Sequence, residues 1–524
     1  MKTIFVIGDG STNLKFQVYD AENFQLLHSR SISTPKKLID DKPYMDFTTE
    51  MRWYDECMYE VPSEYKISSV ISPSVRGVTA ALVDSKNRII DTETDGIVMD
   101  YTYRFPSQVN QKFEELCVSI EDYYQETGSV AECPTGFLLL KKLLYYELMR
   151  PDIINNAAYF IIFPLLFSGH YLKGKYAEAW KNGGNQTTFW LAHTGARKIN
   201  QYPNTMVSSV AKKINSFSRL VPIEKKHDAT KNLGLISKSK AKQLGFQNAP
   251  IIFPGSHDFA LSDYASNFIF RNKYPGIEDF FHLEVGTWSA CSLISRNKRQ
   301  LILPFNGYKK GIITCGSIEN VSRATALYGG GQDFKYVQQI FEKREIDFKV
   351  DYVDLKTLKL VLRDSDCFLL PNISPDSYNS GPFPELKGKI LNKEKFFNKN
   401  IHIPYIVTNL SVVLAIAYQI ELISSNTGIP IVVTGGGSDD KYYTLLLSLV
   451  TGRDVYIIKE TKTEKPFKET SSMGAALLTR HSKNNNSLNS LYSLDHVSKN
   501  QDTHLKKDII KYRRKFLDLI NRNT

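Results

Sequence analysis

Short apolar strands that run into glycine- or hydroxyl-rich turns recur along this chain, and no other feature constrains its fold as strongly. They are expected at residues 2–7, 251–254, 280–284 and 430–434. Stretches with helical periodicity lie among them, for example at 410–424. An alternation of strands and helices favours an α/β fold with a substantial parallel sheet.

The length of the chain predicts more than one domain. With 524 residues it is too long for a single hydrophobic core. We expect an N-terminal domain over 1–259 and a C-terminal domain over 260–480, followed by a basic tail over 481–524. The helical pattern at 259–270 is expected to carry the chain from the first domain into the second.

Composition and cysteine usage narrow the class of protein. Apolar residues make up 42% and charged residues 23%, which excludes a disordered, collagen-like or coiled-coil chain. The six cysteines are scattered without a C-x-x-C pair, which argues against a zinc site or disulfide framework and indicates a reducing compartment. The apolar run at 157–167 is too short to span a membrane, and residues 2–7 lack the features of a signal peptide. We therefore expect a cytoplasmic protein without membrane contact.

Positive charge is unevenly spread along the chain. Lys and Arg outnumber Asp and Glu by 66 to 55, a net charge of +11, and residues 481–524 carry +5 of it. From Leu505 onward this tail has the apolar spacing of a basic amphipathic helix. Such a helix could contact RNA or anionic lipid, or dock on the protein through its apolar face, which we favour. A nucleic-acid partner is not expected, because acidic residues are interspersed throughout and no groove-binding motif is present.

The first strand ends in Asp9 and a turn that suits a phosphate and Mg²⁺. Backbone N–H groups can approach a phosphate where glycine leaves room, and a carboxylate can hold Mg²⁺ directly or through water. The residues of this turn are Gly10, Ser11, Thr12, Asn13 and Lys15, of which the last adds positive charge. The alternative is a hairpin turn whose residues serve only its geometry.

Two further strand ends carry polar side chains. After residues 251–254, Asp258 could accept a proton from a substrate hydroxyl and His257 could bind a sugar hydroxyl. The alternative role of Asp258 is a helix N-cap. Gly286 and Thr287 follow another strand and could hold a phosphate through hydroxyl and N–H groups, or form a simple hairpin turn.

The strongest motif follows the strand at 430–434. Gly435, Gly436, Gly437 and Ser438 lie between a buried strand and a helix, where glycine lets the backbone lie against a ligand. The helix N-terminus there favours a phosphate or ribose. The motif is neither G-x-G-x-x-G nor Walker A, and a flexible turn is the alternative.

These four segments, in this order and at these spacings, resemble the FGGY family of carbohydrate kinases. The likeness covers roughly residues 2–480, and the motifs at 256–258 and 286–289 are most similar to the rhamnulokinase and L-fuculokinase branch. The resemblance implies an α/β, two-domain ribonuclease H-like fold of the actin and hexokinase ATPase type, with a central cleft. It also implies ATP-dependent phosphorylation of a sugar hydroxyl, with ATP and Mg²⁺ as cofactors. The sugar expected is a ketose such as a 6-deoxy-ketohexose, or a related pentulose or polyol.

The resemblance also assigns roles to individual positions. Asp258 becomes the general base, and Asp9 becomes the metal ligand. The predicted nucleotide-binding residues are Gly10, Ser11, Thr12, Asn13, Lys15, Gly286, Thr287, Gly435, Gly436, Gly437 and Ser438. The predicted sugar-binding residues are Arg76, Gly77, Gln186, His257 and Asp258. A sugar and ATP are the expected partners, and the sequence allows a homodimer.

The chain departs from the family pattern at two acidic positions. The family's first turn usually reads Asp-x-Gly-Thr-Thr/Ser, which aligns its Asp with Gly8 and places Asp9 at the x position. Neighbouring side chains on a strand point to opposite faces, so Asp9 reaches the same metal site only if Gly8 permits a local kink. The branch also carries Trp-Gly-Val-Asp where this chain ends the motif in Thr79. Both departures support the alternative of a non-catalytic, ATP- or sugar-binding relative with a regulatory role.

Overall fold

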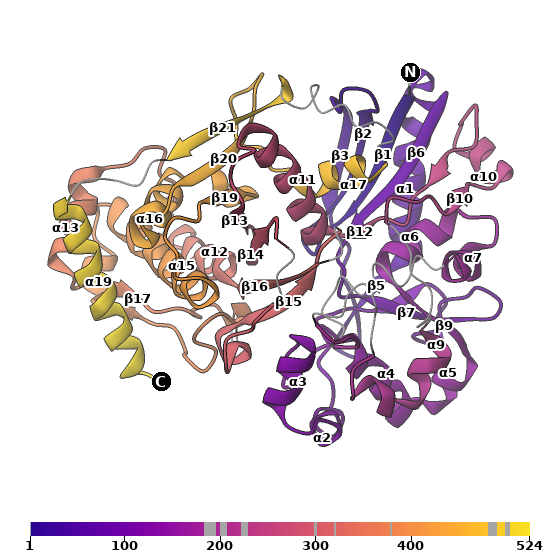
Figure 1. Ribbon diagram of the computed structural model, residues 1–524, viewed down its shortest axis with the longest axis horizontal. Helices are drawn as coiled ribbons and strands as arrows, with labels where there is room; N and C mark the ends of the chain where they lie inside the picture. The colour runs from indigo at the N-terminus through magenta and orange to yellow at the C-terminus, as the bar shows by residue number, and fades with distance from the viewer. Residues whose placement is uncertain are drawn as a thin grey trace. The chain divides into compact units, whose positions relative to one another are not determined.

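The chain forms two compact units, drawn in the computed structural model of Figure 1. The structure describes residues 2–182, 195–199, 207–221, 229–297, 301–318, 321–377, 380–479, 490–497 and 503–524. Unit 1 comprises residues 1–265, 314–322 and 469–488, and unit 2 comprises 266–313, 323–468 and 489–524. The chain first passes from unit 1 to unit 2 within α11 (Asp258–Lys273), where the sequence predicted a connecting helix.

Unit 1 is built on a mixed sheet whose central strand is β1 (Lys2–Asp9). The strand order is β10-β11-β6-β1-β2-β3, and β12 also pairs with β6. Strand β1 is buried from its second residue onward. It pairs in parallel with β6 and antiparallel with β2, and β12 runs parallel to β6. The carboxyl ends of β1, β6 and β12 therefore meet at one edge of the sheet. The other strands of this sheet are β2 (Asn13–Asp20), β3 (Leu26–Ser33), β6 (Ser68–Val75), β10 (Gly234–Leu235), β11 (Ile251–Ile252) and β12 (Ser256–His257).

Helices and two smaller sheets complete unit 1. Helix α17 (Thr470–Leu478) packs against β1 and β6, α6 (Phe163–Tyr171) against β6, and α1 (Phe47–Glu60) against β2 (Figure 1). The smaller sheets join β4 (Lys37–Ile39), β5 (Lys42–Asp46) and β8 (Ile97–Met99), and β7 (Ala80–Asp84) with β9 (Ala157–Ile162). The remaining helices are α2 (Ser107–Leu116), α3 (Ile120–Thr127), α4 (Leu139–Met149), α5 (Pro151–Asn156), α7 (Lys175–Lys181), α9 (Asn215–Leu220) and α10 (Lys238–Gln243).

Unit 2 also has a mixed sheet. Strand β13 (Asp279–Val285) lies between an antiparallel neighbour, β14 (Ser289–Ser295), and a parallel one, β19 (Ile431–Thr434). Strand β20 (Val455–Glu460) pairs in parallel with β19, and β21 (Tyr492–Val497) pairs antiparallel with β20. The other strands are β15 (Ile312–Gly316), β16 (Ser322–Tyr328), β17 (Phe368–Leu369) and β18 (Ile390–Leu391). Of these, β16 pairs with β14. The predicted strands at 280–284 and 430–434 are confirmed.

The helices of unit 2 surround α15 (His402–Ile423). Among the described residues, α15 is the one helix long and apolar enough to cross a membrane, but 78% of its most apolar window is buried. It packs against α16 (Lys441–Thr451), α12 (Gly330–Glu342) and α13 (Leu355–Asp364), so it is a core helix. The remaining helices are α14 (Lys393–Phe396) and α19 (Thr503–Asn521).

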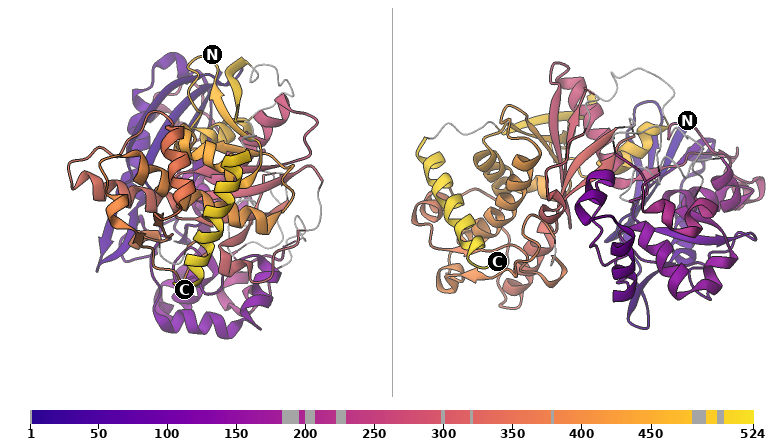
Figure 2. Two further views of the ribbon diagram at one scale, coloured as in Figure 1. Left: turned by 90° about the vertical axis from the view of Figure 1, so that its left-hand side faces the viewer. Right: turned by 60° about the horizontal axis from the view of Figure 1, so that its bottom comes forward.

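The end of the basic tail is part of the core of unit 2. Helix α19 packs against α13 and α16, and the two views of Figure 2 show it in yellow beside the orange helices. Its buried face consists of Leu505, Ile509, Tyr512, Phe516 and Ile520. The Tyr512 hydroxyl donates a hydrogen bond of 2.9 Å to the carbonyl oxygen of Cys367. The helix therefore docks on the protein through its apolar face, as expected, although Ile510, which the apolar spacing also placed on that face, is exposed.

Removal of a buried ring from α19 is expected to destabilise unit 2. Phe516 is 1% exposed, so Phe516→Ala should lower the free energy of unfolding by about 3–5 kcal/mol through lost burial and a cavity. Ile510 lies on the same helix but is 58% exposed, so Ile510→Ala should change the free energy of unfolding by less than about 0.5 kcal/mol. Urea denaturation followed by circular dichroism measures both. Equal effects of the two substitutions would show that α19 is not docked.

Candidate active site

The first predicted phosphate turn follows β1 without a break in the strand. Gly8 is in register with Ser74 of β6, and Asp9 with Val75. The kink that would bring Asp9 to the position of Gly8 is therefore absent, and the two residues face opposite sides of the sheet. The turn itself closes with a hydrogen bond of 3.0 Å from the backbone N–H of Gly10 to the carbonyl oxygen of Asn13.

Asp9 is held by an arginine that follows the neighbouring strand. Arg76 Nε lies 2.9 Å from Oδ2 of Asp9, and Arg76 Nη2 lies 2.8 Å from Oδ1. The third nitrogen, Nη1, lies 3.1 Å from Oδ2 of Asp100. The backbone N–H of Arg76 also donates to the Asp9 carbonyl oxygen at 3.0 Å. The side chain of Asp9 is fully buried and that of Arg76 is 7% exposed, so this is a bidentate ion pair shielded from water.

Glu50 of α1 is a third carboxyl group beside this arginine. It is fully buried, and neither of its carboxyl oxygens has a hydrogen-bond partner. Burial, followed by the negative charge of Asp9, raises the pKa of Glu50 well above its ordinary value, and Arg76 only partly opposes the rise. Burial also raises the pKa of Asp9, again against the effect of Arg76. Since one guanidinium faces three carboxyl groups, we expect Glu50 to carry a proton.

The opposite face of β1 carries a different set of groups. A Cβ atom built on Gly8 would lie 3.2 Å from the Cβ of Lys15 and 3.8 Å from Oγ of Ser472, which belongs to α17. Lys15 Nζ lies 2.8 and 3.0 Å from the two carboxylate oxygens of Glu469, the residue that precedes α17. Lys15 is thus paired with an acid of its own unit at the side of the sheet that Gly8 faces.

Asp258 stands at the same sheet edge, at the start of α11. Its Oδ1 accepts a hydrogen bond of 2.8 Å from the backbone N–H of Phe259 and lies 3.1 Å from Nε2 of His257. The side chain of Asp258 remains 37% exposed, whereas that of Asp9 is fully buried. A Cβ atom on Gly77 would come within 2.5 Å of the His257 ring, so glycine is needed there for the ring to pack against the backbone.

Tyr101 is a member of this site that the sequence analysis missed. Burial, followed by the charge of Asp100, raises the pKa of this phenol. The Ser11 side chain and the charge of Asp258 also act on this pKa, so Tyr101 lies near the first turn and Asp258. It lies in a loop after β8, where neither periodicity nor a motif distinguishes it.

The glycine motif of unit 2 folds against the end of β13. Gly435 has φ 82° and ψ −175°, a conformation that is essentially restricted to glycine. A Cβ atom there would lie 2.6 Å from the carbonyl oxygen of Val285, and one on Gly437 would lie 2.2 Å from Val285 Cγ1. Oγ of Ser438 donates a hydrogen bond of 2.6 Å back to the carbonyl oxygen of Gly435. The backbone of the motif thus packs directly against Val285, which precedes the predicted turn at Gly286 and Thr287.

A second run of three glycines lies at the same turn and was also missed. Gly329, Gly330 and Gly331 lead into α12. A Cβ atom on Gly331 would lie 2.0 Å from the carbonyl oxygen of Gly286, so the two loops touch through their backbones. The signal that identified Gly435 to Gly437, successive glycines between a strand and a helix, was equally present here. Gly286 and Thr287 themselves are exposed.

The predicted site residues fall into two groups. The first turn, Arg76, Gly77, His257 and Asp258 gather at one sheet edge of unit 1. Gly286, Thr287 and the motif 435–438 gather at the end of β13 in unit 2. Gln186 lies outside the residues that the structure describes.

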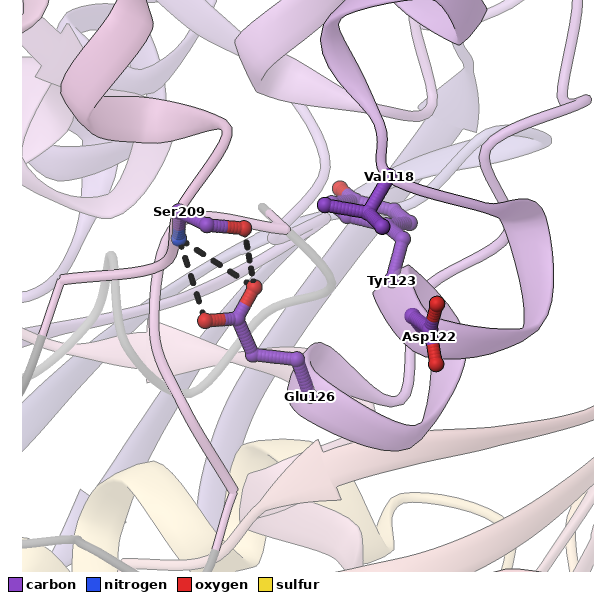
Figure 3. A pocket seen from close by; sticks show the side chains of 5 residues that line it. All are labelled: Val118, Asp122, Tyr123, Glu126 and Ser209. Carbon is purple, nitrogen blue, oxygen red and sulfur yellow. Dashed lines mark hydrogen bonds between the residues drawn. The ribbon is translucent and has the colours of Figure 1, made fainter.

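A pocket of about 260 Å³ beside α3 lies apart from these groups (Figure 3). It is lined by Val118, Asp122, Tyr123, Glu126 and Ser209. The carboxylate of Glu126 accepts hydrogen bonds from the backbone N–H and the hydroxyl of Ser209, the latter at 2.6 Å. Lys198 also pairs with Glu126 at 3.0 Å. Glu126 therefore fixes the walls of this pocket.

The conformation of Gly435 predicts a selective effect of alanine within the motif. Gly435→Ala should lower the free energy of unfolding by roughly 1–3 kcal/mol or more, because the backbone region is disallowed for alanine and Val285 is in the way. Gly436→Ala is the matched control, since its Cβ would find the nearest atom at 4.0 Å. Urea denaturation of both variants is the measurement. A Gly435→Ala protein as stable as Gly436→Ala would contradict the described loop.

The raised pKa of Glu50 predicts a pH dependence of stability. Unfolding returns Glu50 to its ordinary pKa of about 4.3, so the unfolded chain loses a proton that the folded chain retains. As pH rises above this value, the free energy of unfolding of wild type is therefore expected to fall relative to that of Glu50→Gln. The slope should reach up to about 1.4 kcal/mol per pH unit, until the pH reaches the raised pKa of the folded state. Urea denaturation across a pH series measures the difference. Glu56→Gln, an exposed change on the same helix, is the control, and parallel curves for wild type and Glu50→Gln would refute the assignment.

Solved structures of other proteins share this fold. No protein-family model matches the chain, and no curated protein matches its sequence. Solved structures do match. Xylulose kinase from Lactobacillus acidophilus has a TM-score of 0.76 at 15% identity, over 100% of this chain and 98% of that one. Gluconate kinase from the same organism has a TM-score of 0.75 at 16% identity, over 99% and 98%. Plasmodium falciparum glycerol kinase with ADP has a TM-score of 0.71 at 16% identity, over 100% and 98%.

These similarities extend over essentially the whole chain and over both units. None of the three is a rhamnulokinase or an L-fuculokinase, so that closer branch stays a prediction. The expected fold class is confirmed: the chain has the two-domain α/β fold of carbohydrate kinases, the actin and hexokinase type of ATPase fold.

Proposed function

We propose that this protein is an ATP-dependent carbohydrate kinase that uses Asp258 as general base to phosphorylate a sugar hydroxyl. The observation that carries the proposal is the place of Asp258, a partly exposed carboxylate at the sheet edge where the glycine turn after β1 also lies. The fold supports it, since xylulose, gluconate and glycerol kinases share it along their full lengths.

The surroundings of Asp258 suit proton transfer. The backbone N–H of Phe259 and the ring of His257 fix Oδ1, which orients the carboxylate. A carboxylate held in this way can accept the proton of a substrate hydroxyl as that oxygen attacks phosphorus. His257 Nδ1 is buried without a hydrogen-bond partner, so a substrate hydroxyl could bind there. We propose that Asp258 and His257 contact the sugar.

The glycine motif of unit 2 is proposed to contact the nucleotide. In unit 2, Gly436 is exposed and Gly437 is half-buried, and we propose that the backbone of these two residues contacts the ribose or adenine. The ADP in the similar glycerol kinase structure supports a nucleotide substrate. In unit 1, the N–H of Gly10 closes the first turn by bonding to Asn13, and we propose that the residues at its tip, Ser11 and Thr12, contact a phosphate.

Mg²⁺ is the metal that the fold family implies, and Asp9 is the acid of the first turn that would hold it. Both oxygens of Asp9 accept hydrogen bonds from Arg76, inside a fully buried ion pair. The guanidinium takes one lone pair of each oxygen, and burial beside its positive charge closes the remaining lone pairs to a hydrated divalent cation. Asp9 therefore does not fit the role of metal ligand.

The substrate class proposed is a ketose such as a 6-deoxy-ketohexose, or a related pentulose or polyol. The motif similarity to the rhamnulokinase and L-fuculokinase branch supports this choice, although Thr79 replaces the acid of that branch. Arg76 and Gly77 lie next to His257 and are proposed to shape the sugar site. The six free cysteines support an intracellular, reducing location.

The second candidate is a non-catalytic relative that binds ATP or a sugar and acts as a regulator. The specific observation in its favour is the ion pair that occupies Asp9, because phosphoryl transfer by this fold would otherwise place a carboxylate of the first turn near the phosphates. Sugar-dependent ADP release separates the two candidates.

Asp258→Asn is expected to lower kcat about 10²–10⁴-fold while leaving the fold intact, because it removes the proton acceptor but keeps the shape of the side chain. The assay is sugar-dependent ADP release over ketoses, polyols, aldoses and aldonates, with circular dichroism to check folding. Glu64→Gln changes an exposed carboxylate of the same unit and serves as the control. Near-normal turnover of Asp258→Asn on the best sugar would refute its role. Nucleotide binding without release on any sugar would favour the regulator.

A further inference from the structure

We infer that Lys142 and Asp91 are positioning residues of the proposed sugar site. They hold the start of β7 and the end of β8 in place, and so keep Arg76 and Asp100 in contact, without touching the sugar themselves. The inference rests on the proposed function, because it concerns how the sugar site keeps its shape. It can also be tested without turnover, because the mobility of these strand ends can be measured directly.

Lys142 of α4 is the centre of a buried network in unit 1. Its side chain is 2% exposed, and its Nζ lies 2.6 Å from Oδ2 of Asp91, whose side chain is fully buried. The same ammonium donates hydrogen bonds to the carbonyl oxygens of Ala80 and Met99, the latter at 3.4 Å. Ala80 is the first residue of β7 and Met99 is the last residue of β8. One side chain therefore joins α4 to the ends of two strands.

Asp91 bonds the same two strands through their N–H groups. Its Oδ1 accepts a hydrogen bond of 2.8 Å from Leu82 in β7, and its Oδ2 accepts one of 2.9 Å from Met99 in β8. Its carbonyl oxygen accepts a hydrogen bond of 3.1 Å from the Tyr146 hydroxyl, which also belongs to α4. Strand β7 pairs with β9, whereas β8 pairs with β5, so the two strands belong to different sheets. The pair of Lys142 and Asp91 thus supplies bonds that a shared ladder would otherwise provide.

The anchored strand ends lead directly to the proposed sugar site. Met99 is bonded at its N–H by Asp91 and at its carbonyl oxygen by Lys142, so the residue before Asp100 is fixed on both sides. Oδ2 of Asp100 accepts a hydrogen bond of 3.1 Å from Arg76 Nη1. On the other strand, the anchored residue Ala80 follows Gly77 by three positions. Loss of the anchor would let the Arg76 contact and the loop at Gly77 drift.

The charges of the pair decide which variant can test its role. Burial lowers the pKa of Lys142, and the charge of Asp91, followed by that of Asp100, opposes the fall. Removal of one partner would leave the other charge buried and unpaired, which is strongly unfavourable for folding. A variant that tests positioning must therefore remove both charges together.

The test variant is Lys142→Met combined with Asp91→Asn, which leaves no unpaired charge and keeps an amide in place of the carboxylate. The matched control is Lys141→Met, which removes a fully buried ammonium from the same helix. Nζ of Lys141 donates to Oδ1 of Asn110 at 2.9 Å and to the carbonyl oxygen of Cys133 at 2.6 Å, and neither residue belongs to β7 or β8. Thermal melting reports whether each variant folds.

Two measurements follow the site. Steady-state ADP release gives KM for ATP and for the best sugar of the screen, and amide hydrogen exchange read by mass spectrometry gives the mobility of residues 97–103. The double variant should raise the sugar KM on the order of tenfold and change the ATP KM by less than about twofold. Exchange over residues 97–103 should be about tenfold faster than in wild type. Lys141→Met should leave both KM values and this exchange within about twofold of wild type.

A merely structural role gives a different result. It would lower the active fraction of the enzyme, which reduces kcat and leaves both KM values unchanged. A folded double variant with that behaviour, or with equal rises in the two KM values, would overturn the inference. If the double variant does not fold, Tyr146→Phe decides, since it removes only the hydrogen bond to the Asp91 carbonyl oxygen. Faster exchange over residues 97–103 in Tyr146→Phe supports the inference, and unchanged exchange overturns it.

The outcomes keep this inference apart from the proposed function. If wild type releases no ADP with any sugar, the proposed kinase fails. Hydrogen exchange in the variants still shows whether Lys142 and Asp91 fix the end of β8. If wild type is an active kinase and the double variant keeps its sugar KM, the kinase stands and this inference fails.

Discussion

The pairing of Arg76 with Asp9 is the contact on which the arrangement of the candidate site in unit 1 depends. Parallel strands β1 and β6 end side by side, and this pair joins their ends through two side-chain hydrogen bonds and one backbone hydrogen bond. The turn predicted to bind phosphate starts directly after Asp9, and Gly77 follows Arg76 and packs against the ring of His257, which belongs to β12. Because water is excluded, the pair is much stiffer than an ion pair at the surface.

Burying this arginine has consequences for the charges around it. Three carboxyl groups, those of Asp9, Asp100 and Glu50, face one guanidinium that cannot lose its proton. Full ionisation would leave two excess negative charges in a region of low dielectric, and a protonated Glu50 halves that excess. A metal would balance the same charges only while bound. The arginine balances them always, so the end of β1 is preorganised in the absence of any ligand.

Local patterns in the sequence predict the strand ends and the directions of neighbouring side chains at this edge of the sheet. Strand periodicity alone predicts that Gly8 and Asp9 face opposite sides, and the unbroken register of β1 agrees. The partner of Asp9 could not be predicted, because Arg76 lies 67 residues further along the chain and a pairing of side chains leaves no periodic trace. Tyr101 was missed for the same reason. The run of three glycines from Gly329 to Gly331 is visible in the sequence. The reason for it, the backbone contact with Gly286, is seen only in the structure.

The contrast between Asp9 and Asp258 shows how two aspartates at one sheet edge acquire different roles. Both follow buried strands, and residue type alone does not separate them. Asp9 is fully buried with both oxygens bonded to the guanidinium of Arg76, so it holds the fold together and its remaining lone pairs are enclosed. Asp258 is bonded through Oδ1 to its own helix N-terminus and remains 37% exposed. Orientation without enclosure is what a general base needs, because it must reach a substrate hydroxyl and receive its proton. The placement of the acids thus makes Asp9 part of a buried ion pair and leaves Asp258 accessible, as the proposed general base requires.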